Sequence, residues 1–215
     1  IPPYLPQLVS EDPVDHAERS NYFLYCFDAN SILERKNPLA LLEAFRRAFP
    51  QGDTPHDVRL IFKVTYPDRS IPDVEALYQA STEDSRIEVI DELLGKEALH
   101  TLISHALAYV SPHRSEGLGL TVIEAMGCGV PAITTQYGGL LEFIDAESAF
   151  PVEFSLREIE TEAFPYPEGY VWCDPSIESM AKHMRFVQEN AGAARLKGAA
   201  GRRRIMDRLC SDQLI

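Results

Sequence analysis

The chain has 215 residues, of which 45% are hydrophobic and 25% charged, a balance that supplies a real core and excludes disorder of the chain as a whole. Its length allows one sizeable domain or two small ones, but not two full α/β domains. The 20 Lys and Arg residues against 33 Asp and Glu give a net charge of −13, so we expect no binding to nucleic acid.

The first 20 residues contain four prolines and a polar stretch, which predicts a linker or interdomain segment over residues 1–20. We place the domain itself at residues 21–190. No run approaches the roughly 20 apolar residues of a membrane span, so none is predicted. The four cysteines lie far apart without a CxxC pair, which we interpret as reduced thiols of a cytoplasmic protein, with a disulfide framework as the alternative.

Short apolar runs alternate along the chain with segments whose apolar residues have helical spacing. The runs predict five strands, at residues 22–27, 58–65, 86–90, 106–110 and 131–135. The segments between them predict four helices, at residues 38–49, 73–80, 96–105 and 121–126. This alternation is typical of an α/β fold with a parallel sheet that is covered by helices on both faces. Ligands of such sheets bind beyond the carboxyl ends of the strands.

The C-terminal third of the chain breaks the alternation. Residues 152–169 are acidic and rich in proline, and we predict a long surface excursion there. An Asp-Pro pair at residues 174–175 is predicted to start a helix. Residues 191–215 are predicted to form a basic C-terminal helix, since residues 191–208 hold six Lys or Arg and one Asp. Its arginines form either a solvated helical face or a contact for an anionic membrane or a partner domain.

The segment from Ser111 to Pro131 is the most informative, because it connects a predicted strand with a predicted helix. Gly117 and Gly119 allow a ligand to approach the backbone closely, and the N-terminus of the following helix favours negative charge. These features predict a cradle for a diphosphate. A nicotinamide-type site is disfavoured because Val122 stands where the fingerprint has its third glycine, and the chain has no Walker-type Gly-Lys-Ser sequence.

Two glutamates lie in this segment, Glu116 in the loop and Glu124 in the first helical turn. Thr121 and Glu124 have the spacing of a capping box, which gives Glu124 a purely structural explanation. Glu116 has no such explanation. A carboxylate beside a diphosphate is unfavourable unless sugar hydroxyls or a cation use its oxygens.

Glu116 and Glu124 frame the sequence Glu-Gly-Leu-Gly-Leu-Thr-Val-Ile-Glu, which resembles the E-x7-E motif of retaining nucleotide-sugar glycosyltransferases with the GT-B fold, family 4 or group 1. Further segments resemble the same family, at residues 27–28, 34–38, 111–117, 124–134, 137–139 and 166–175. The resemblance covers residues 21–190. It implies the C-terminal half of a GT-B fold, a Rossmann-like domain that binds the donor.

The resemblance also implies roles for particular residues. The first glutamate of the motif, here Glu116, faces the hydroxyls of the donor sugar as the catalytic residue, and the second, Glu124, holds the ribose. The nucleobase packs on the backbone after the third strand, near Ile90. The diphosphate meets the backbone of the glycine-rich segment, which is formed by Gly117, Leu118, Gly119, Leu120 and Thr121.

The cations of the family's diphosphate site are only partly present. The lysine that follows the first strand and binds the phosphates corresponds to Lys36, with Arg35 beside it. The usual Gly-Arg pair a few residues earlier is absent, because Ala29 and Asn30 stand there. Lys63, at the end of the second predicted strand, either replaces this arginine or is a solvated strand-end lysine.

We expect neither a metal nor any other cofactor. The Asp-x-Asp sequence of metal-chelated diphosphate sites is absent, and the histidines have no metal-ligand spacing with cysteines or carboxylates. His113 is a candidate catalytic base, or else a surface residue or a supporting residue of the loop.

The function implied by the resemblance is transfer of a sugar from a nucleoside diphosphate sugar to a glycan or other acceptor, with the anomeric configuration retained. The donor-binding half would need an N-terminal acceptor-binding domain for activity. The whole protein would be cytoplasmic, with peripheral contact to the inner face of the membrane left open. Two alternatives remain: another GT-B enzyme, such as a nucleotide-sugar epimerase or a glucan phosphorylase, and a non-catalytic nucleotide-sugar-binding module.

Overall fold

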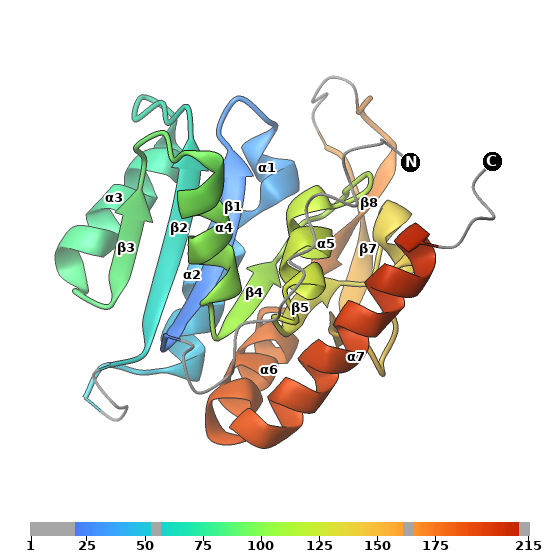
Figure 1. The fold of residues 1–215 in the computed structure, drawn as a ribbon. Helices are drawn as coiled ribbons and strands as arrows, with labels where there is room; N and C mark the ends of the chain where they lie inside the picture. The colour runs from blue at the N-terminus through green and yellow to red at the C-terminus, as the bar shows by residue number, and fades with distance from the viewer. Residues whose placement is uncertain (1–19, 53–56, 161–165, 211–215) are drawn as a thin grey trace.

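The computed structural model describes residues 20–52, 57–160 and 166–210, so the expected linker over residues 1–20 lies outside it except for its last residue. A six-stranded sheet forms the middle layer (Figure 1), with the spatial order β3-β2-β1-β4-β5-β6. Its strands are β1 (Tyr22–Asp28), β2 (Arg59–Thr65), β3 (Ile87–Ile90), β4 (Ala108–Ser111), β5 (Ala132–Thr135) and β6 (Phe150–Val152). All neighbouring strands pair in parallel, which confirms the predicted sheet.

Helices cover both faces of this sheet, also as predicted (Figure 1). On one face α2 (Pro38–Ala48) packs against α3 (Pro72–Glu83) and α6 (Ile177–Glu189), and on the other face lie α4 (Lys96–Ser104) and α5 (Leu120–Gly127). Because the central strands are enclosed from both sides, almost every residue of β1 is buried. The apolar runs of the sequence therefore mark the core directly.

The C-terminal helix α7 (Ala191–Cys210) packs along α5 (Figure 1). Gly198 allows this close contact, since a Cβ atom there would overlap the carbonyl oxygen of Gly129. Part of the basic side of α7 forms contacts within the domain. Arg202 donates to the last carbonyl of α5, and Arg204 forms an ion pair of 2.6 Å with Asp145. Among the described residues, no helix is both long and apolar enough to cross a membrane.

The predicted surface excursion over residues 152–169 contains a strand that was not predicted. There β7 (Phe154–Glu158) pairs antiparallel with β8 (Val171–Pro175) in a separate two-stranded sheet. The buried side chains of Trp172 and Cys173 attach β8 to the domain. Most side chains of β7 are exposed, so the segment lacks the apolar run that indicates a buried strand. The rest of the stretch lies partly outside the described residues.

Three short elements and one helix start also differ from the sequence-based expectation. The strand β6, a single helical turn α1 (Leu33–Lys36) and a 3-10 helix η3 (Gly138–Glu142) were not predicted. The Asp-Pro pair at residues 174–175 closes β8 instead of starting α6. The cap of α6 is Ser176, whose hydroxyl accepts the N–H of Ser179 at 3.2 Å.

Candidate functional site

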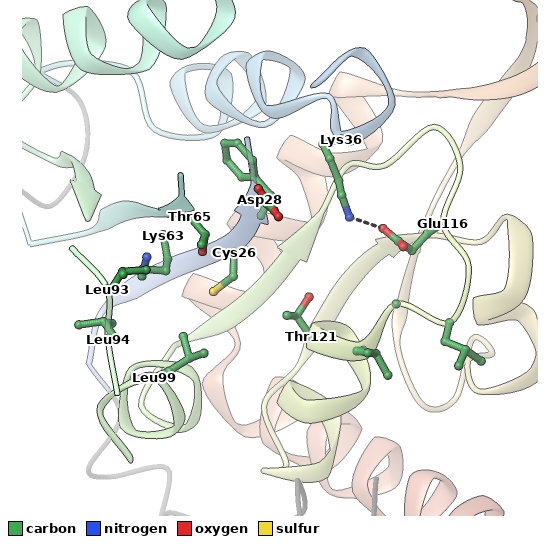
Figure 2. Close-up of a pocket in the computed structure, with 14 residues that line it drawn as sticks. Cys26, Asp28, Lys36, Lys63, Thr65, Leu93, Leu94, Leu99, Glu116 and Thr121 are labelled. Carbon is green, nitrogen blue, oxygen red and sulfur yellow. Dashed lines mark hydrogen bonds and ion pairs between the residues drawn. The ribbon is translucent and has the colours of Figure 1, made fainter. Parts of the chain in front are cut away.

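A cleft of about 590 Å³ lies beyond the carboxyl ends of β1 and β2 and beside the N-terminus of α5 (Figure 2). This volume falls within the roughly 300–1,000 Å³ of small-molecule sites. Seven of the predicted site residues line it: Lys36, Lys63, Glu116, Leu118, Gly119, Leu120 and Thr121. Four others do not: Arg35, Ile90, Gly117 and Glu124. The structure therefore gathers most of the predicted residues at one place.

The floor of the cleft is one face of the sheet. In the register of β1 and β2, Cys26 pairs with Lys63 and Asp28 pairs with Thr65. Alternate residues of a strand point to the same face, so these four side chains share one surface. Figure 2 shows them together at the strand ends, with Thr121 facing them from α5.

The helix α5 starts differently from the prediction. Gly119 is its N-cap with φ +64°, a left-handed conformation that glycine adopts without strain, and no side chain caps the helix. Thr121 is inside the first turn, where its hydroxyl accepts a hydrogen bond of 2.8 Å from Tyr109. The predicted capping box of Thr121 and Glu124 is therefore wrong, because Gly119 starts the helix too early for it.

The turn at the start of α5 offers backbone donors to the cleft. Val122 is the first residue whose N–H finds a backbone acceptor, the carbonyl of Gly119 at 2.9 Å. Within the part of the chain that the structure describes, the N–H groups of residues 118–121 donate to no protein acceptor. Together with the positive end of the helix dipole, these groups have the chemistry that suits an anion.

Two glycines of η3 hold the preceding loop in place. The N–H of Gly139 donates to the carbonyl of Glu116 at 3.1 Å. A Cβ atom on Gly138 would lie 2.5 Å from that same carbonyl oxygen, and one on Gly139 would overlap the carbonyl oxygen of Gly117. The loop therefore packs directly on a backbone without side chains, which explains why the sequence has two glycines here.

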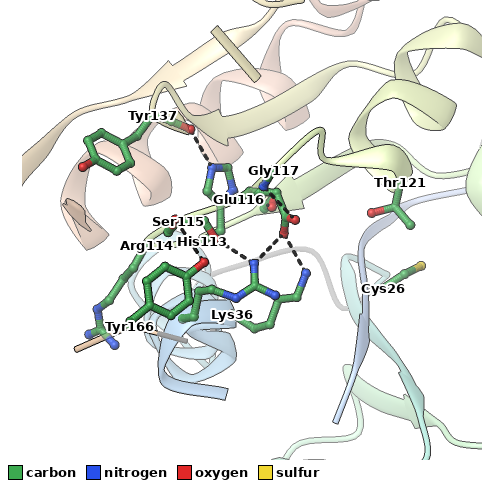
Figure 3. Close-up of polar contacts among 12 residues, drawn as sticks. Cys26, Lys36, His113, Arg114, Ser115, Glu116, Gly117, Thr121, Tyr137 and Tyr166 are labelled. Carbon is green, nitrogen blue, oxygen red and sulfur yellow. Dashed lines mark hydrogen bonds and ion pairs between the residues drawn. The ribbon is translucent and has the colours of Figure 1, made fainter. Parts of the chain in front are cut away.

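Glu116 forms ion pairs with two basic residues of α1 (Figure 3). Its Oε2 lies 2.6 Å from Nζ of Lys36 and 3.3 Å from Nη1 of Arg35, which also donates to the carbonyl of Ser115 at 2.8 Å. Burial acts to raise the pKa of Glu116, but the charges of Lys36 and Arg35 outweigh it and lower the pKa below its ordinary value. The carboxylate is thus ionised and fixed in orientation at the cleft.

Arg114 ties the same loop to its surroundings. Its backbone N–H donates to the carbonyl of Arg35 at 2.8 Å, and its guanidinium donates to the carbonyl of Glu34 at 2.7 Å. Its Nε also pairs with Asp174 of β8 at 2.9 Å. These bonds connect the loop with α1 and with the two-stranded sheet, so they support the position of Glu116.

His113 does not line the cleft, which leaves it without a direct route to a ligand there. The prediction that it is a surface residue is also wrong, because its side chain is fully buried. Its ring nitrogens lie 3.0 Å from the hydroxyl of Ser111 and 3.4 Å from the carbonyl of Tyr137 (Figure 3). Burial lowers the pKa of His113 to about 4, so the ring is neutral near pH 7. His113 therefore supports the loop through these two contacts.

Lys63 is not a solvated strand-end lysine, since only 4% of it is exposed. It lies inside β2, and its Nζ donates to the carbonyl of Val64 at 3.1 Å. Ile90, the last residue of β3, pairs with Lys63 in the sheet and is half-buried outside the cleft lining.

Glu124 lies one turn into α5, half-buried and away from the cleft lining. Burial raises its pKa above the ordinary value, against a weaker opposing effect of Lys96. Its carboxylate has no hydrogen-bond or ion-pair partner among the described residues. The two glutamates of the motif are therefore in different states, one paired and one unpaired.

Sequence reasoning missed an apolar wall of the cleft, formed by Leu93, Leu94 and Leu99. Leu93 is 74% exposed, although leucine is an apolar residue. The signal that could have found this wall is the pair of leucines that follows the third strand within an otherwise polar connection. In the described residues no group of three or more His, Cys, Asp or Glu side chains is arranged to hold a metal ion.

The comparison with protein families decides the classification. The model of the family described as glycosyl transferases group 1 matches residues 23–160. The chain belongs to this family. A sucrose synthase of Melioribacter roseus is 42% identical over an alignment of 99 residues, which covers 41% of this chain and 12% of that relative.

Solved structures share the fold. The C-terminal domain of the group 1 glycosyltransferase LpcC from Francisella tularensis has a TM-score of 0.67 at 15% identity, with 94% of both chains covered. HepE of Anabaena, solved in complex with UDP and glucose, has a TM-score of 0.63 at 15% identity. The match to HepE covers 90% of this chain but only 45% of HepE. The fold is therefore that of the Rossmann-like C-terminal domains of GT-B glycosyltransferases.

Proposed function

We propose that this domain binds the donor of a retaining glycosyltransferase, which moves a sugar from a nucleoside diphosphate sugar to a glycan or other acceptor. The observation that carries the proposal is the position of Glu116. It lies at the edge of a cleft that is also lined by Lys36, Lys63 and the start of α5, which supply donors suited to a diphosphate. Membership of the group 1 family and the similarity to HepE, which was solved with UDP and glucose, support the same function.

The diphosphate binds at the start of α5. The unpaired N–H groups of residues 118–121 point to the phosphate oxygens, and Lys36 adds positive charge from α1. Its ammonium has three donors, of which Glu116 uses one. During transfer, negative charge grows on the leaving diphosphate, and fixed donors at this position stabilise it without rearrangement. For this reason we expect binding without a divalent metal.

The sugar lies beside Glu116. A carboxylate accepts hydrogen bonds from hydroxyls, and its two ion pairs hold it in one orientation for this contact. On the other side of the diphosphate, Glu124 accepts the ribose hydroxyls, which would give its unpaired carboxylate partners. The nucleobase packs near Ile90, against the apolar wall of Leu93 and Leu94.

The acceptor is bound by a second domain. The HepE chain is more than twice as long as the part of it that this chain matches. For the whole protein we expect an N-terminal acceptor-binding domain and a cytoplasmic location, and we leave open a peripheral contact with the membrane. The domain alone would bind donor but transfer no sugar.

Thermal unfolding tests the proposal directly. The chain is heated with EDTA and with diphosphates of uridine, guanosine, adenosine, cytidine or thymidine, together with their common sugar esters. A ligand that binds only the folded state at 100 times its Kd adds about 2.7 kcal/mol of stability, a shift of several degrees. We expect such a shift for at least one nucleotide. No shift for any of them, or a shift only with divalent metal, would contradict the proposal.

A further inference from the structure

The two-stranded sheet of β7 and β8 (Figure 1) has one edge that is attached to the domain and one that is open. On the β8 side, the N–H of Cys173 donates to the carbonyl of Arg114 at 3.0 Å. On the opposite side, β7 pairs with no strand other than β8 among the described residues. An open edge presents a row of backbone donors and acceptors with which another strand can pair.

The hydrogen bonds at the two ends of β7 show which of its backbone groups point outward. The carbonyl of Glu153 accepts the N–H of the residue after β8 at 2.7 Å, and the N–H of Ile159 donates to the carbonyl of the residue before β8 at 2.7 Å. Because these directions alternate along an antiparallel strand, the backbone groups of Phe154, Leu156 and Glu158 point away from β8. In the described part of the chain they have no backbone partner.

The side chains along this edge are suited to a second contact. Phe154 is 40% exposed and Leu156 is 65% exposed, and both lie on one face of the strand. On the other face, Arg157 lies 3.9 Å from its nearest carboxylate oxygens. Glu153, directly before β7, is exposed and forms no ion pair with any described residue. Exposed apolar side chains and loosely paired charges therefore occur together at an open edge.

We propose that β7 pairs with β7 of a second copy of this chain, so that two domains share a four-stranded antiparallel sheet about a two-fold axis. One register places Ser155 on the axis, opposite the partner's Ser155. Phe154 then lies opposite the partner's Leu156, and Arg157 lies opposite the partner's Glu153. Apolar side chains meet on one face and opposite charges meet on the other, which stabilises cross-strand pairs.

The outward backbone groups fit the same register. Phe154 and the partner's Leu156 form a hydrogen-bonded pair that exchanges both N–H···O bonds, and the two-fold axis repeats this pair. A register shifted by two residues would place Leu156 on the axis and bring Phe154 against Glu158. A further shift would place Arg157 opposite the partner's Arg157, and like charges directly opposite each other are destabilising.

Sedimentation equilibrium measures the dimer. The paired edge is short and each copy has a net charge of −13, so we expect a dissociation constant in the micromolar range. Leu156→Lys should weaken association ~10-fold or more, because it places a charge in the apolar contact. Leu196→Lys is the matched control, since Leu196 is a 69% exposed leucine of α7, and it should leave association unchanged.

Charge reversal tests the other face of the paired strands. Arg157→Glu alone should weaken association, because two glutamates would then face each other at each end of the pairing. The double variant Arg157→Glu with Glu153→Arg should restore it. If the double variant associates no better than Arg157→Glu, the proposed register is wrong.

Disulfide formation in oxidised glutathione tests the register directly. Opposed residues of a pair that is not hydrogen-bonded have Cα atoms about 4.5 Å apart, within the range of a disulfide. Ser155→Cys should therefore crosslink with itself, and Arg157→Cys should not. A mixture of Arg157→Cys and Glu153→Cys should form the crosslinked heterodimer. The wild type is the control, and its described cysteines are buried.

Three results would overturn the proposal: a chain that stays monomeric up to about 1 mM, a dimer that Leu156→Lys leaves intact, or crosslinking of Arg157→Cys without crosslinking of Ser155→Cys. Should Leu156→Lys not fold, the charge-reversal variants and the crosslinks carry the test. None of these results bears on the proposed function, because β7 lies outside the lining of the cleft.

Discussion

The two walls of the cleft use positive charge in opposite ways. On the α1 side, Lys36 and Arg35 both pair with Glu116, so two cations and one carboxylate are held together before any ligand arrives. On the β2 side, Lys63 is buried, and no described residue forms an ion pair with it. The comparison teaches that ion pairs fix the charged groups of the first wall, whereas burial and one hydrogen bond hold the lysine of the second. Variants in the first wall and in α5 test one side of this difference.

The largest effect is expected for Glu116→Ala in a protein that also has the acceptor-binding domain. Sugar transfer should fall by about 100-fold or more, because the donor sugar loses the group that orients it. Binding of the bare nucleoside diphosphate should not weaken, since the change removes a negative charge and frees Lys36. Radiolabelled transfer and calorimetry on the same variant measure both, with Glu168→Ala, an exposed glutamate before β8, as the control. Loss of nucleotide binding together with transfer would contradict the role of Glu116.

The next effect concerns the backbone that supports the first wall. Gly139→Ala forces a Cβ atom onto the carbonyl of Gly117 and should cost about 1–3 kcal/mol of unfolding free energy. Gly117→Ala is the matched control, because nothing lies within 4 Å of its Cβ position. Denaturant unfolding measures both variants. Equal stability of the two would mean that the loop is not held by this contact.

A smaller effect is expected from the ion pair itself. The folded pKa of Glu116 is lowered, so its contribution to stability is present above pH 4.5, its ordinary pKa, and is lost as the pH falls through the folded value. Lys36→Met removes the strongest attracting charge. At pH 7 the variant should lose about 1 kcal/mol, and this difference from the wild type should shrink below pH 4.5. Denaturant unfolding of both proteins across this pH range measures the difference in unfolding free energy. A difference that stays constant with pH would show that the ion pair is not its source.

The smallest effect on stability is expected for Glu124→Gln, and its sign is opposite. Because burial raises the folded pKa of Glu124, its charge destabilises the domain above pH 4.5. The variant should gain less than about 1 kcal/mol at pH 7, and the gain should vanish as the pH falls. In calorimetry, nucleoside diphosphates should bind more weakly and pyrophosphate equally well. Equal weakening of both ligands would argue against a ribose contact.

The sheet was predictable because its strands are enclosed, so burial leaves an almost continuous apolar run in the sequence. For the same reason, the sequence already contained a sign that Lys63 is buried. A lysine within the run Leu60-Ile61-Phe62 and Val64 is surrounded by buried positions on its own strand, which indicates burial rather than solvation. The strand β7 could not be predicted in this way, because its side chains face solvent.

Two features of the site depend on contacts that local patterns do not contain. Lys36 and Glu116 are 80 residues apart, and only the parallel order of β1 and β4 brings their loops together. The capping box failed for a local reason: Thr121 and Glu124 have the right spacing, but Gly119 adopts a left-handed conformation and starts the helix before them. The conformation of Gly119 therefore decides where the helix starts, and the spacing of Thr121 and Glu124 does not.

The central claim is that the cleft beside α5 holds the nucleoside diphosphate, and amide hydrogen exchange with and without that ligand tests it most directly. Bound phosphates should slow exchange at residues 118–121, whose N–H groups lack protein acceptors in the described part of the chain. Exchange in α7 should not change. Protection centred elsewhere, for example in the hollow between α7 and residues 145–148, or no protection by a ligand that binds, would contradict the account.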